Sequence, residues 1–208
     1  MIESAIGIIL RTRPLTETSL IVNWLTAEQG RISTVAKGAR RPKSPFTGKL
    51  DLHYEAEFNF TRSRSSELHA LREIKLMETH ASLREELGWL QQAAYATALI
   101  EQTTERETPL PGLYTLLHDL LNHLPQQPPQ PRTVYAFELK LLNELGLAPE
   151  LDGSNLTNST RKLALALSTV SWHELPKLTA TATQAKELRQ FLHQFLLSHL
   201  GRIPKGRP

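Results

Sequence analysis

The sequence predicts an α+β fold in which five short strands precede a bundle of helices. Up to about residue 77 the hydrophobic pattern is strand-like, and turn residues separate five runs, at residues 6–13, 18–26, 31–37, 50–60 and 67–77. After residue 80 the apolar residues recur at helical spacing. Strands that come first and helices that follow, without alternation, are typical of an α+β protein. We therefore expect two domains, at residues 1–80 and 81–208.

The strand-like half suits a small barrel or a sandwich. Its clearest strand runs from Leu50 to Phe60, and the polar residues that alternate with its apolar side are Asp51, His53, Glu55, Glu57 and Asn59. Because successive side chains of a strand point to opposite faces, one face should be buried and the other wet. Four aromatic residues lie on apolar strand sides and are expected in the core: Trp24, Tyr54, Phe58 and Phe60.

The helical half should begin with a helix from Ser82 to about Arg106. Ser82 stands three residues before Glu85, which is the spacing of a capping box. One face of this helix should carry Leu83, Leu87, Leu90, Ala94 and Ala98. Six leucines in residues 113–124 predict a second helix, which ends at the proline-rich connector 125–132.

Two further helices should complete the bundle. One fits Thr133–Leu145 and is closed by Gly146, and a longer one fits Thr181–Leu200 and is closed by Gly201. Glycine is favoured at such ends because the residue after a helix often adopts a left-handed conformation. Between these helices, leucines at 163, 165 and 167 alternate with alanines, which suits a short strand as well as a helix.

The composition excludes several kinds of chemistry. The 208 residues include no cysteine, so disulfides, thiolate catalysis and cysteine-ligated zinc or iron–sulfur sites are excluded. The nucleotide-binding motifs GxxxxGKS/T and GxGxxG are absent, as are the zinc-protease motif HExxH and the hydrolase motif GxSxG. No two of the eight histidines lie four residues apart, as paired metal ligands on a helix would. We expect neither an enzyme nor a cofactor.

The sequence also lacks membrane and export signals. No apolar stretch approaches the roughly 20 residues of a membrane-spanning helix. The first residues lack the charged and apolar regions of a secretory signal. We expect a cytoplasmic protein without a membrane partner.

A basic loop is the strongest functional signal. Residues 37–49 contain Lys37, Arg40, Arg41, Lys43 and Lys49 but no carboxylate, although the net charge of the whole chain is only +3. A local positive field of this kind attracts polyanions. Residues 202–208 hold three more cations, which either contact DNA or merely aid solubility.

A five-stranded barrel with a basic loop is the usual outline of an OB-fold, which binds nucleic acids with a charged groove and stacking aromatic residues. Only Phe46, inside the basic loop, could stack on a base, and packing back onto the barrel rim is an equal alternative. Arg11 and Arg13 share one side of the first strand and either extend the field of the loop or are solvated charges. Binding should therefore be mostly electrostatic.

Several segments of the sequence resemble the RecO family of bacterial recombination mediators. The resemblance begins with Leu10–Leu20 and Leu25–Arg31, and its most specific part is the Lys-Gly-Ala-Arg-Arg run inside Val35–Ser44. It continues through Leu71–Glu73 and Tyr95 to Phe137–Gly146 and Pro149. It covers most of residues 5–150.

The resemblance implies an N-terminal OB-fold, a helical domain and non-catalytic DNA binding. It implies annealing of complementary strands and loading of recombinase onto strands coated by single-strand-binding protein, in a nucleoid-associated bacterial protein. The implied partners are single- and double-stranded DNA, RecR, and the acidic C-terminal tail of the single-strand-binding protein, which docks on the helical domain. The matched segments give a DNA role to Arg11, Arg13, Arg31, Lys37, Arg40, Arg41 and Lys43, and the loop adds Phe46 and Lys49.

The sequence departs from the family in one respect. Many members carry two cysteine pairs that bind zinc, whereas Ser154 and Thr157 stand near the expected spacing here, in a remnant of the zinc module at about 150–175. Without thiolates this structural zinc cannot form, and we expect a metal-free protein. The missing module leaves room for a second interpretation, that of a protein-interaction adaptor with weak or no DNA binding.

Overall fold

The computed structural model describes residues 2–207 and contains two compact units. The first unit is formed by the residues up to Ala81 together with Thr104–His118. The second is formed by Ser82–Thr103 together with the residues from Asp119 onward. The first unit therefore includes a segment from the helical half of the sequence. The division into domains at residue 80 stays a prediction.

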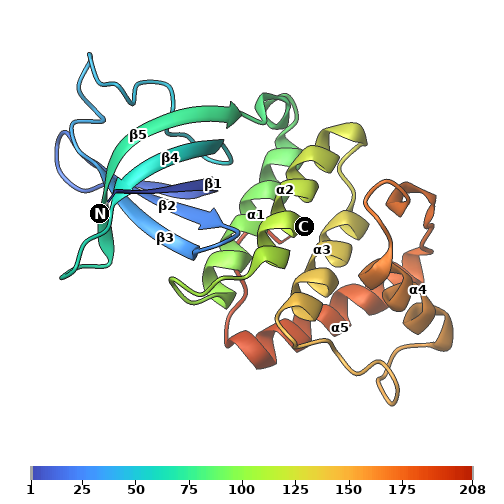
Figure 1. Ribbon diagram of the computed structural model, residues 1–208. Coiled ribbons are helices and arrows are strands. Elements are labelled where there is room, and N and C mark those ends of the chain that lie inside the picture. Colours follow the sequence, from blue (N-terminus) through green and yellow to red (C-terminus); the bar gives the residue numbers. More distant parts are fainter. Residues whose placement is uncertain (1, 208) are drawn as a thin grey trace. The chain divides into compact units, whose positions relative to one another are not determined.

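The first unit is built on a closed barrel of five strands (Figure 1), whose order is β1-β2-β3-β5-β4. The strands are β1 (Ile2–Pro14), β2 (Leu20–Thr26), β3 (Gly30–Ala36), β4 (Glu55–Thr61) and β5 (Leu68–Glu78). All pairs are antiparallel except β3 and β5, which run parallel. The structure thus confirms the barrel of the predicted α+β fold.

Aromatic residues fill the barrel as their alternation predicts. Trp24 and Phe58 are stacked with ring centroids 4.0 Å apart, and both are almost completely buried. The indole Nε1 of Trp24 donates to Thr34 Oγ1 at 2.8 Å, so its polar group is satisfied inside the core. Phe60 is also buried, and Tyr54 packs against the cluster while remaining half-buried.

The fourth strand is shorter than the sequence predicts, because it begins at Glu55 and not at Leu50. His53 has a φ of 67°, a left-handed conformation that interrupts the extended backbone. The backbone N–H of His53 donates to the carbonyl of Ile9 at 2.9 Å, which ties the segment before β4 to β1. Residues 50–54 consequently form the end of a long loop rather than the start of a strand.

The segment Thr104–Thr108 is bound to the barrel. The backbone N–H of Glu107 donates to the carbonyl of Arg31 at 2.9 Å, and Arg62 donates both to Glu107 at 2.8 Å and to Glu3 at 2.9 Å. The hydrogen bond and positive charge of Arg62 hold the pKa of Glu3 below its ordinary value. A Cβ at Gly30 would lie 2.0 Å from the carbonyl oxygen of Thr108, so this close approach requires glycine.

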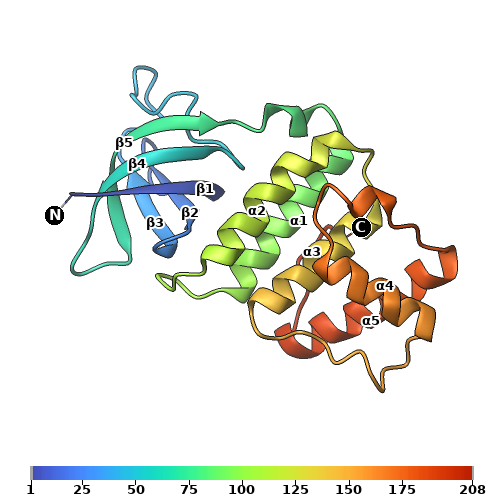
Figure 2. The same cartoon turned by 45° about the vertical axis from the view of Figure 1, so that its right-hand side comes forward.

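Helices dominate the second unit. They are α1 (Leu87–Thr103), α3 (Pro131–Glu144), α4 (Asn158–Thr169) and α5 (Ala182–Leu200), while α2 (Pro111–His123) belongs to both units. Short 3₁₀ turns occupy Ala81–Arg84, Leu124–Gln126 and Leu175–Lys177. Figure 2 shows α4 and α5 beside α3, and the three helices share one apolar core. The undecided segment around residue 165 is helical, because it lies within α4.

The first predicted helix was wrong at its start. Residues 81–84 form a 3₁₀ turn, and α1 begins only at Leu87. The carboxylate of Glu86, not the side chain of Ser82, accepts from an exposed backbone N–H, that of Gly88 at 3.2 Å. The predicted apolar face is not the buried one, since Leu87 is 67% exposed. The buried face is formed instead by Gln92, Ala93, Tyr95, Ala96, Thr97, Leu99 and Ile100.

The ends of α5 are as predicted. Thr181 and Gln184 form a reciprocal capping box, in which each side chain accepts from the backbone N–H of the other. Gly201 closes the helix in the left-handed conformation, with a φ of 69°.

The residues after α5 are not all solvated. The guanidinium of Arg207 donates twice to the carboxylate of Glu138, with both distances 2.7 Å, and Tyr95 Oη donates to Glu138 at 2.5 Å. The side chains of Arg207 and Glu138 are only 8% and 0% exposed. Burial lowers the pKa of Arg207, but the hydrogen bonds and negative charge of Glu138 outweigh this effect and raise it overall. Arg207 is therefore a structural residue of the second unit.

Candidate nucleic-acid interface

The basic loop is a compact structure that joins β3 to β4. Its backbone forms successive tight turns: Arg41 N–H donates to Gly38 at 3.0 Å, Ser44 to Arg41 at 3.1 Å, and Lys49 to Phe46 at 3.0 Å. These internal hydrogen bonds satisfy backbone groups that lie outside the sheet. The loop therefore presents its side chains from a defined backbone.

Strand register brings the basic loop and Arg13 to one end of the barrel. Pro14 pairs with Leu20, and Leu20 pairs with Ala36, so the ends of three neighbouring strands form one row. At about 4.8 Å between strands, Pro14 and Ala36 lie roughly 10 Å apart. The backbone N–H of Arg40 also donates to the carbonyl of Thr18 at 2.9 Å, which joins the basic loop to the β1–β2 loop.

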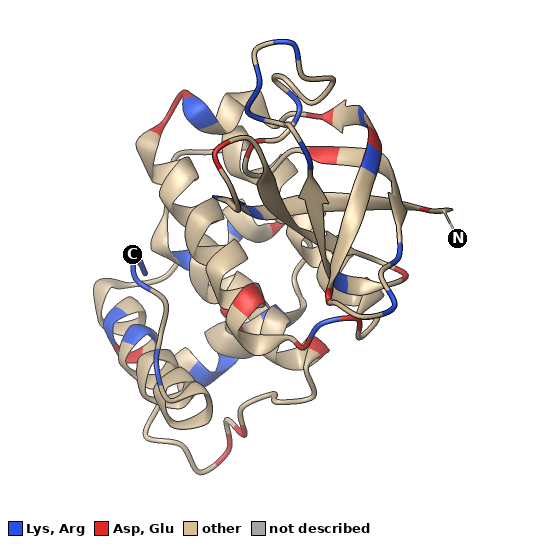
Figure 3. Ribbon diagram, turned by 90° about the vertical axis from the view of Figure 1, so that its left-hand side faces the viewer, with Lys and Arg blue, Asp and Glu red and all other residues tan. Residues whose placement is uncertain are grey.

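Four cations of the loop are exposed at this end: Lys37, Arg40, Arg41 and Lys43. Lys and Arg gather on the loop at the top of Figure 3. Within residues 2–207, no carboxylate pairs with Lys37, Arg41 or Lys43. Arg40 donates to the carbonyl of Thr16 at 3.4 Å, a long bond at an exposed position. The positive charge of the loop is thus available to an external anion.

Arg11 is exposed on β1, two residues before Arg13, and lies opposite Asn23 of β2. A β-bulge lies between Ile9 and Arg11. Arg11 is therefore about 7 Å farther along the strand from the loop end than Arg13. The structure brings Arg13 next to the basic loop and Arg11 within reach of a longer ligand.

Arg31 does not join this cluster. It is half-buried at the start of β3, five residues and roughly 17 Å from the end of the strand that leads into the loop. Its guanidinium donates to the carbonyl of Thr104. This contact and the hydrogen bond from Glu107 to its backbone indicate that Arg31 fixes the 104–108 segment on the barrel.

Phe46 lies in the core. Its ring packs with buried core residues of the barrel, among them Trp24 and Phe58. Its side chain is 6% exposed. Of the two alternatives for Phe46, the structure therefore has the one in which the ring packs back on the barrel. The ring anchors the middle of the basic loop.

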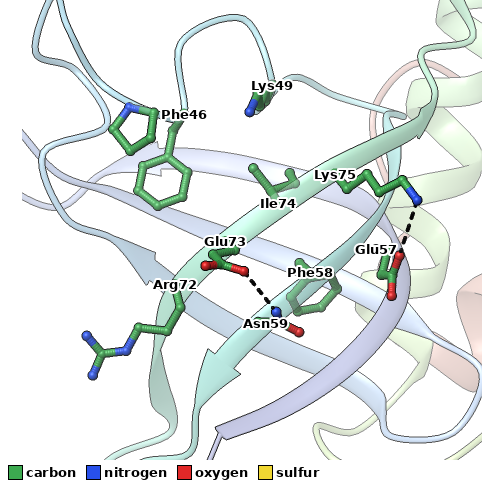
Figure 4. Close-up of a pocket in the computed structure, with 10 residues that line it drawn as sticks. Phe46, Lys49, Glu57, Phe58, Asn59, Arg72, Glu73, Ile74 and Lys75 are labelled. Carbon is green, nitrogen blue, oxygen red and sulfur yellow. Dashed lines mark hydrogen bonds and ion pairs between the residues drawn. The ribbon is translucent and has the colours of Figure 1, made fainter.

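A pocket of ≈420 Å³ lies beside Phe46 (Figure 4) and is partly lined by Lys49. Two further cations from β5, Arg72 and Lys75, also line it. Two carboxylates line the same pocket. Glu57 lies 3.9 Å from Lys75, and Glu73 accepts from Asn59 at 3.2 Å. Arg72 and Lys75 were not predicted from the sequence, because Glu73 and Glu78 balance their charge along the strand. Their position shows only in the structure.

The second unit carries a more apolar pocket of ≈340 Å³ between α3, α4 and α5. Its walls include Leu163, Leu167 and Leu188. Arg132, at the start of α3, donates to the carbonyl of Leu178 at 2.7 Å. Within residues 2–207 the buried Nε of Arg132 has no hydrogen-bond partner. An apolar cavity with a cation in its wall suits an apolar ligand that carries a negative charge.

Residues 2–207 contain no group of three or more His, Asp or Glu side chains that could hold a metal ion. None of the described helices is both long enough and apolar enough to span a membrane.

Known families match both halves of the chain. Residues 1–80 match the family model described as "Recombination protein O N terminal", and residues 85–160 match "Recombination protein O C terminal". A protein of Bacillus pumilus named "DNA repair protein RecO" is 30% identical over 98% of this chain and 81% of its own length. A protein of the same name from Symbiobacterium thermophilum is 36% identical over 70% of this chain, but only 57% of its own length.

A protein of the same name from Bacillus subtilis is 30% identical over 73% of this chain and 59% of its own length. Several relatives are therefore matched over less than two thirds of their length, although the match to the B. pumilus protein is nearly complete on the side of this chain. Together with the barrel and the helical unit, these matches identify the chain as a member of the RecO family, which acts in DNA repair and recombination.

Proposed function

We propose that this protein is a non-catalytic recombination mediator that binds DNA at the basic end of its barrel. The observation that carries the proposal is the cluster of Lys37, Arg40, Arg41 and Lys43 beside Arg13, in which three of the loop cations have no carboxylate partner in residues 2–207. Exposed cations on a compact loop bind phosphates, and phosphate contacts carry no direct sequence information. The protein should therefore bind single- and double-stranded DNA with little base preference.

Phosphate binding at this end also supports annealing and loading of recombinase. Complementary strands repel each other through their phosphates, and a protein that neutralises part of this charge lowers the barrier to pairing. Four further cations lie farther from the loop cluster or beside carboxylates. They would extend the contact with a longer strand: Arg11, Lys49, Arg72 and Lys75. Family membership makes RecR the proposed working partner, in a cytoplasmic and nucleoid-associated setting.

DNA affinity should fall steeply with salt. If the cluster contacts about four phosphates, log affinity should change with log salt at a slope of roughly −3 to −4. Fluorescence anisotropy with a labelled oligonucleotide, at a series of salt concentrations, measures this slope. A slope near zero would be inconsistent with phosphate binding and would favour the adaptor function.

We further propose that the acidic C-terminal tail of the single-strand-binding protein docks in the pocket between α3, α4 and α5. The leucines of this pocket can bury apolar side chains of the tail, and the guanidinium of Arg132 can pair with its carboxylates. The charge and the apolar surface thus lie together in the same cavity. That the protein binds no zinc also stays a prediction.

Replacing Arg132 tests the docking pocket. Arg132→Ala should weaken binding of a synthetic acidic tail peptide about 10- to 100-fold, since charge-assisted hydrogen bonds contribute roughly 1.5–3 kcal/mol. Lys186→Ala is the matched control, because Lys186 is an exposed cation on α5 that does not line the pocket. Isothermal titration calorimetry gives both affinities. Equal affinities of the two variants would place the tail elsewhere.

A further inference from the structure

A second hollow, of ≈460 Å³, lies between the basic loop and the rim of the barrel. It shares Phe46 with the pocket of Figure 4, but the rest of its lining is different. Leu20, Leu50 and Tyr54 contribute apolar surface from the barrel side, and all three pack partly against the barrel core. Arg40 and Arg41 contribute positive charge from the loop side.

This combination matches the two halves of a nucleotide. A nucleobase has a flat, largely apolar face, which stacks on aromatic side chains, and the phosphates beside it require cations. A volume of ≈460 Å³ falls in the ordinary range of small-ligand pockets. The carboxylate of Asp51, which also lines the hollow, accepts from the backbone N–H of Leu52 at 2.8 Å and is thereby held within its own turn.

We propose that this hollow receives one unpaired nucleobase, which stacks against Tyr54 while Arg40 and Arg41 bind the adjoining phosphates. Tyr54 suits this role because it is half-buried, whereas Phe46 is 6% exposed and belongs to the core. The backbone of Tyr54 is held in place, since its carbonyl accepts from Ile9 at 2.9 Å. The inference rests on the proposed DNA-binding function of the loop and adds a site for the base.

A pocket for an unpaired base gives the protein a preference for single strands. A base in a duplex is stacked and paired, and entering the hollow would cost the energy of unstacking and unpairing it. Phosphate contacts at Lys37 and Lys43 remain open to both kinds of DNA. An unpaired strand is therefore held by phosphates and by a base, and pairing with its complement removes the base contact. The hollow would thus favour release of DNA after annealing.

The test separates base contacts from phosphate contacts. One probe is oligothymidylate of about 20 nucleotides, and the other is an oligonucleotide of the same length whose residues are all abasic. Wild-type protein should bind the first about tenfold more tightly, because stacking of one base contributes roughly a factor of ten. Tyr54→Leu, which keeps an apolar side chain in the core, should bind both probes equally and with an unchanged salt slope.

A second variant keeps the test valid if Tyr54→Leu does not fold. Thr47 is exposed and lines the hollow, so Thr47→Trp should obstruct it without changing any charge. It should also lose the preference for bases. Equal binding of the two probes by wild-type protein, or a preference that survives in both variants, would refute the base site and leave phosphate binding intact. If wild-type protein binds neither probe at low salt, the proposed DNA-binding function itself fails.

Discussion

Reversing three charges of the basic loop together, as Arg40→Glu, Arg41→Glu and Lys43→Glu, should lower DNA affinity by about 10²–10³-fold at about 50 mM salt. One phosphate contact with a salt slope near −0.8 contributes roughly a factor of ten at this salt concentration. All three side chains are exposed, so the folded structure should tolerate the changes. Fluorescence anisotropy gives the affinity, and the rate at which complementary strands pair should fall with it.

The matched control carries the same change in net charge at another surface. Lys162, Lys177 and Lys186 are exposed in the second unit, and their replacement by Glu also changes the net charge by six units. This control should lose less than about threefold in affinity, because long-range repulsion is screened by salt. If the loop variant anneals strands as well as wild-type protein, the basic loop is not the DNA site.

Arg207→Ala should destabilise the second unit by about 3 kcal/mol. The carboxylate of Glu138 is 0% exposed, and removal of its guanidinium partner would leave a buried charge with only the hydroxyl of Tyr95 to compensate it. The Nη1 of Arg207 also donates to the carbonyl of Arg189 at 3.2 Å, which would be lost as well. Urea denaturation followed by far-UV circular dichroism, whose signal comes mainly from the helices of this unit, measures its free energy of unfolding.

Arg202→Ala is the corresponding control, because Arg202 lies in the same segment but is exposed. It should change stability by less than about 0.5 kcal/mol. Similar stabilities of the two variants would mean that the segment after α5 does not hold the helices together.

The barrel was predictable because its local and global patterns agree. Alternation of Ala56, Phe58 and Phe60 marked a buried strand face, and the turns between strands were marked by glycine and polar residues. The fourth strand was predicted too long, since the alternation continues through Leu50 and Leu52 while the backbone does not. The left-handed conformation of His53 interrupts the strand there, and a pattern of apolar residues carries no information about it.

The starts of the helices were also predicted only in part. The start of α5 at Thr181 was predicted correctly, whereas the capping-box spacing of Ser82 and Glu85 lies at a 3₁₀ turn. A capping motif is local, and the start of a helix also depends on which of its faces the core can bury. The exposure of Leu87 is the result of that tertiary preference.

The candidate site was also predicted only in part. The loop cations could be found from sequence because they are adjacent in the chain. Arg31 was included because it lies in a segment that resembles the family, although its guanidinium is bound to the Thr104 carbonyl at the far end of β3. Arg72 and Lys75 were missed because β5 approaches the loop only in three dimensions. Nearness in sequence is a weak guide to nearness in a barrel whose β3 and β5 are joined by a long connection.

The central claim, that the basic loop binds DNA phosphates, is tested most directly by a difference in salt slopes. The neutral triple variant Arg40→Ala, Arg41→Ala and Lys43→Ala removes up to three phosphate contacts without adding repulsion. Its slope for single-stranded DNA should be less steep than that of wild-type protein by about 2, since each contact contributes roughly 0.7. Identical slopes for variant and wild-type protein would show that these three residues contact no phosphate, and would contradict the claim.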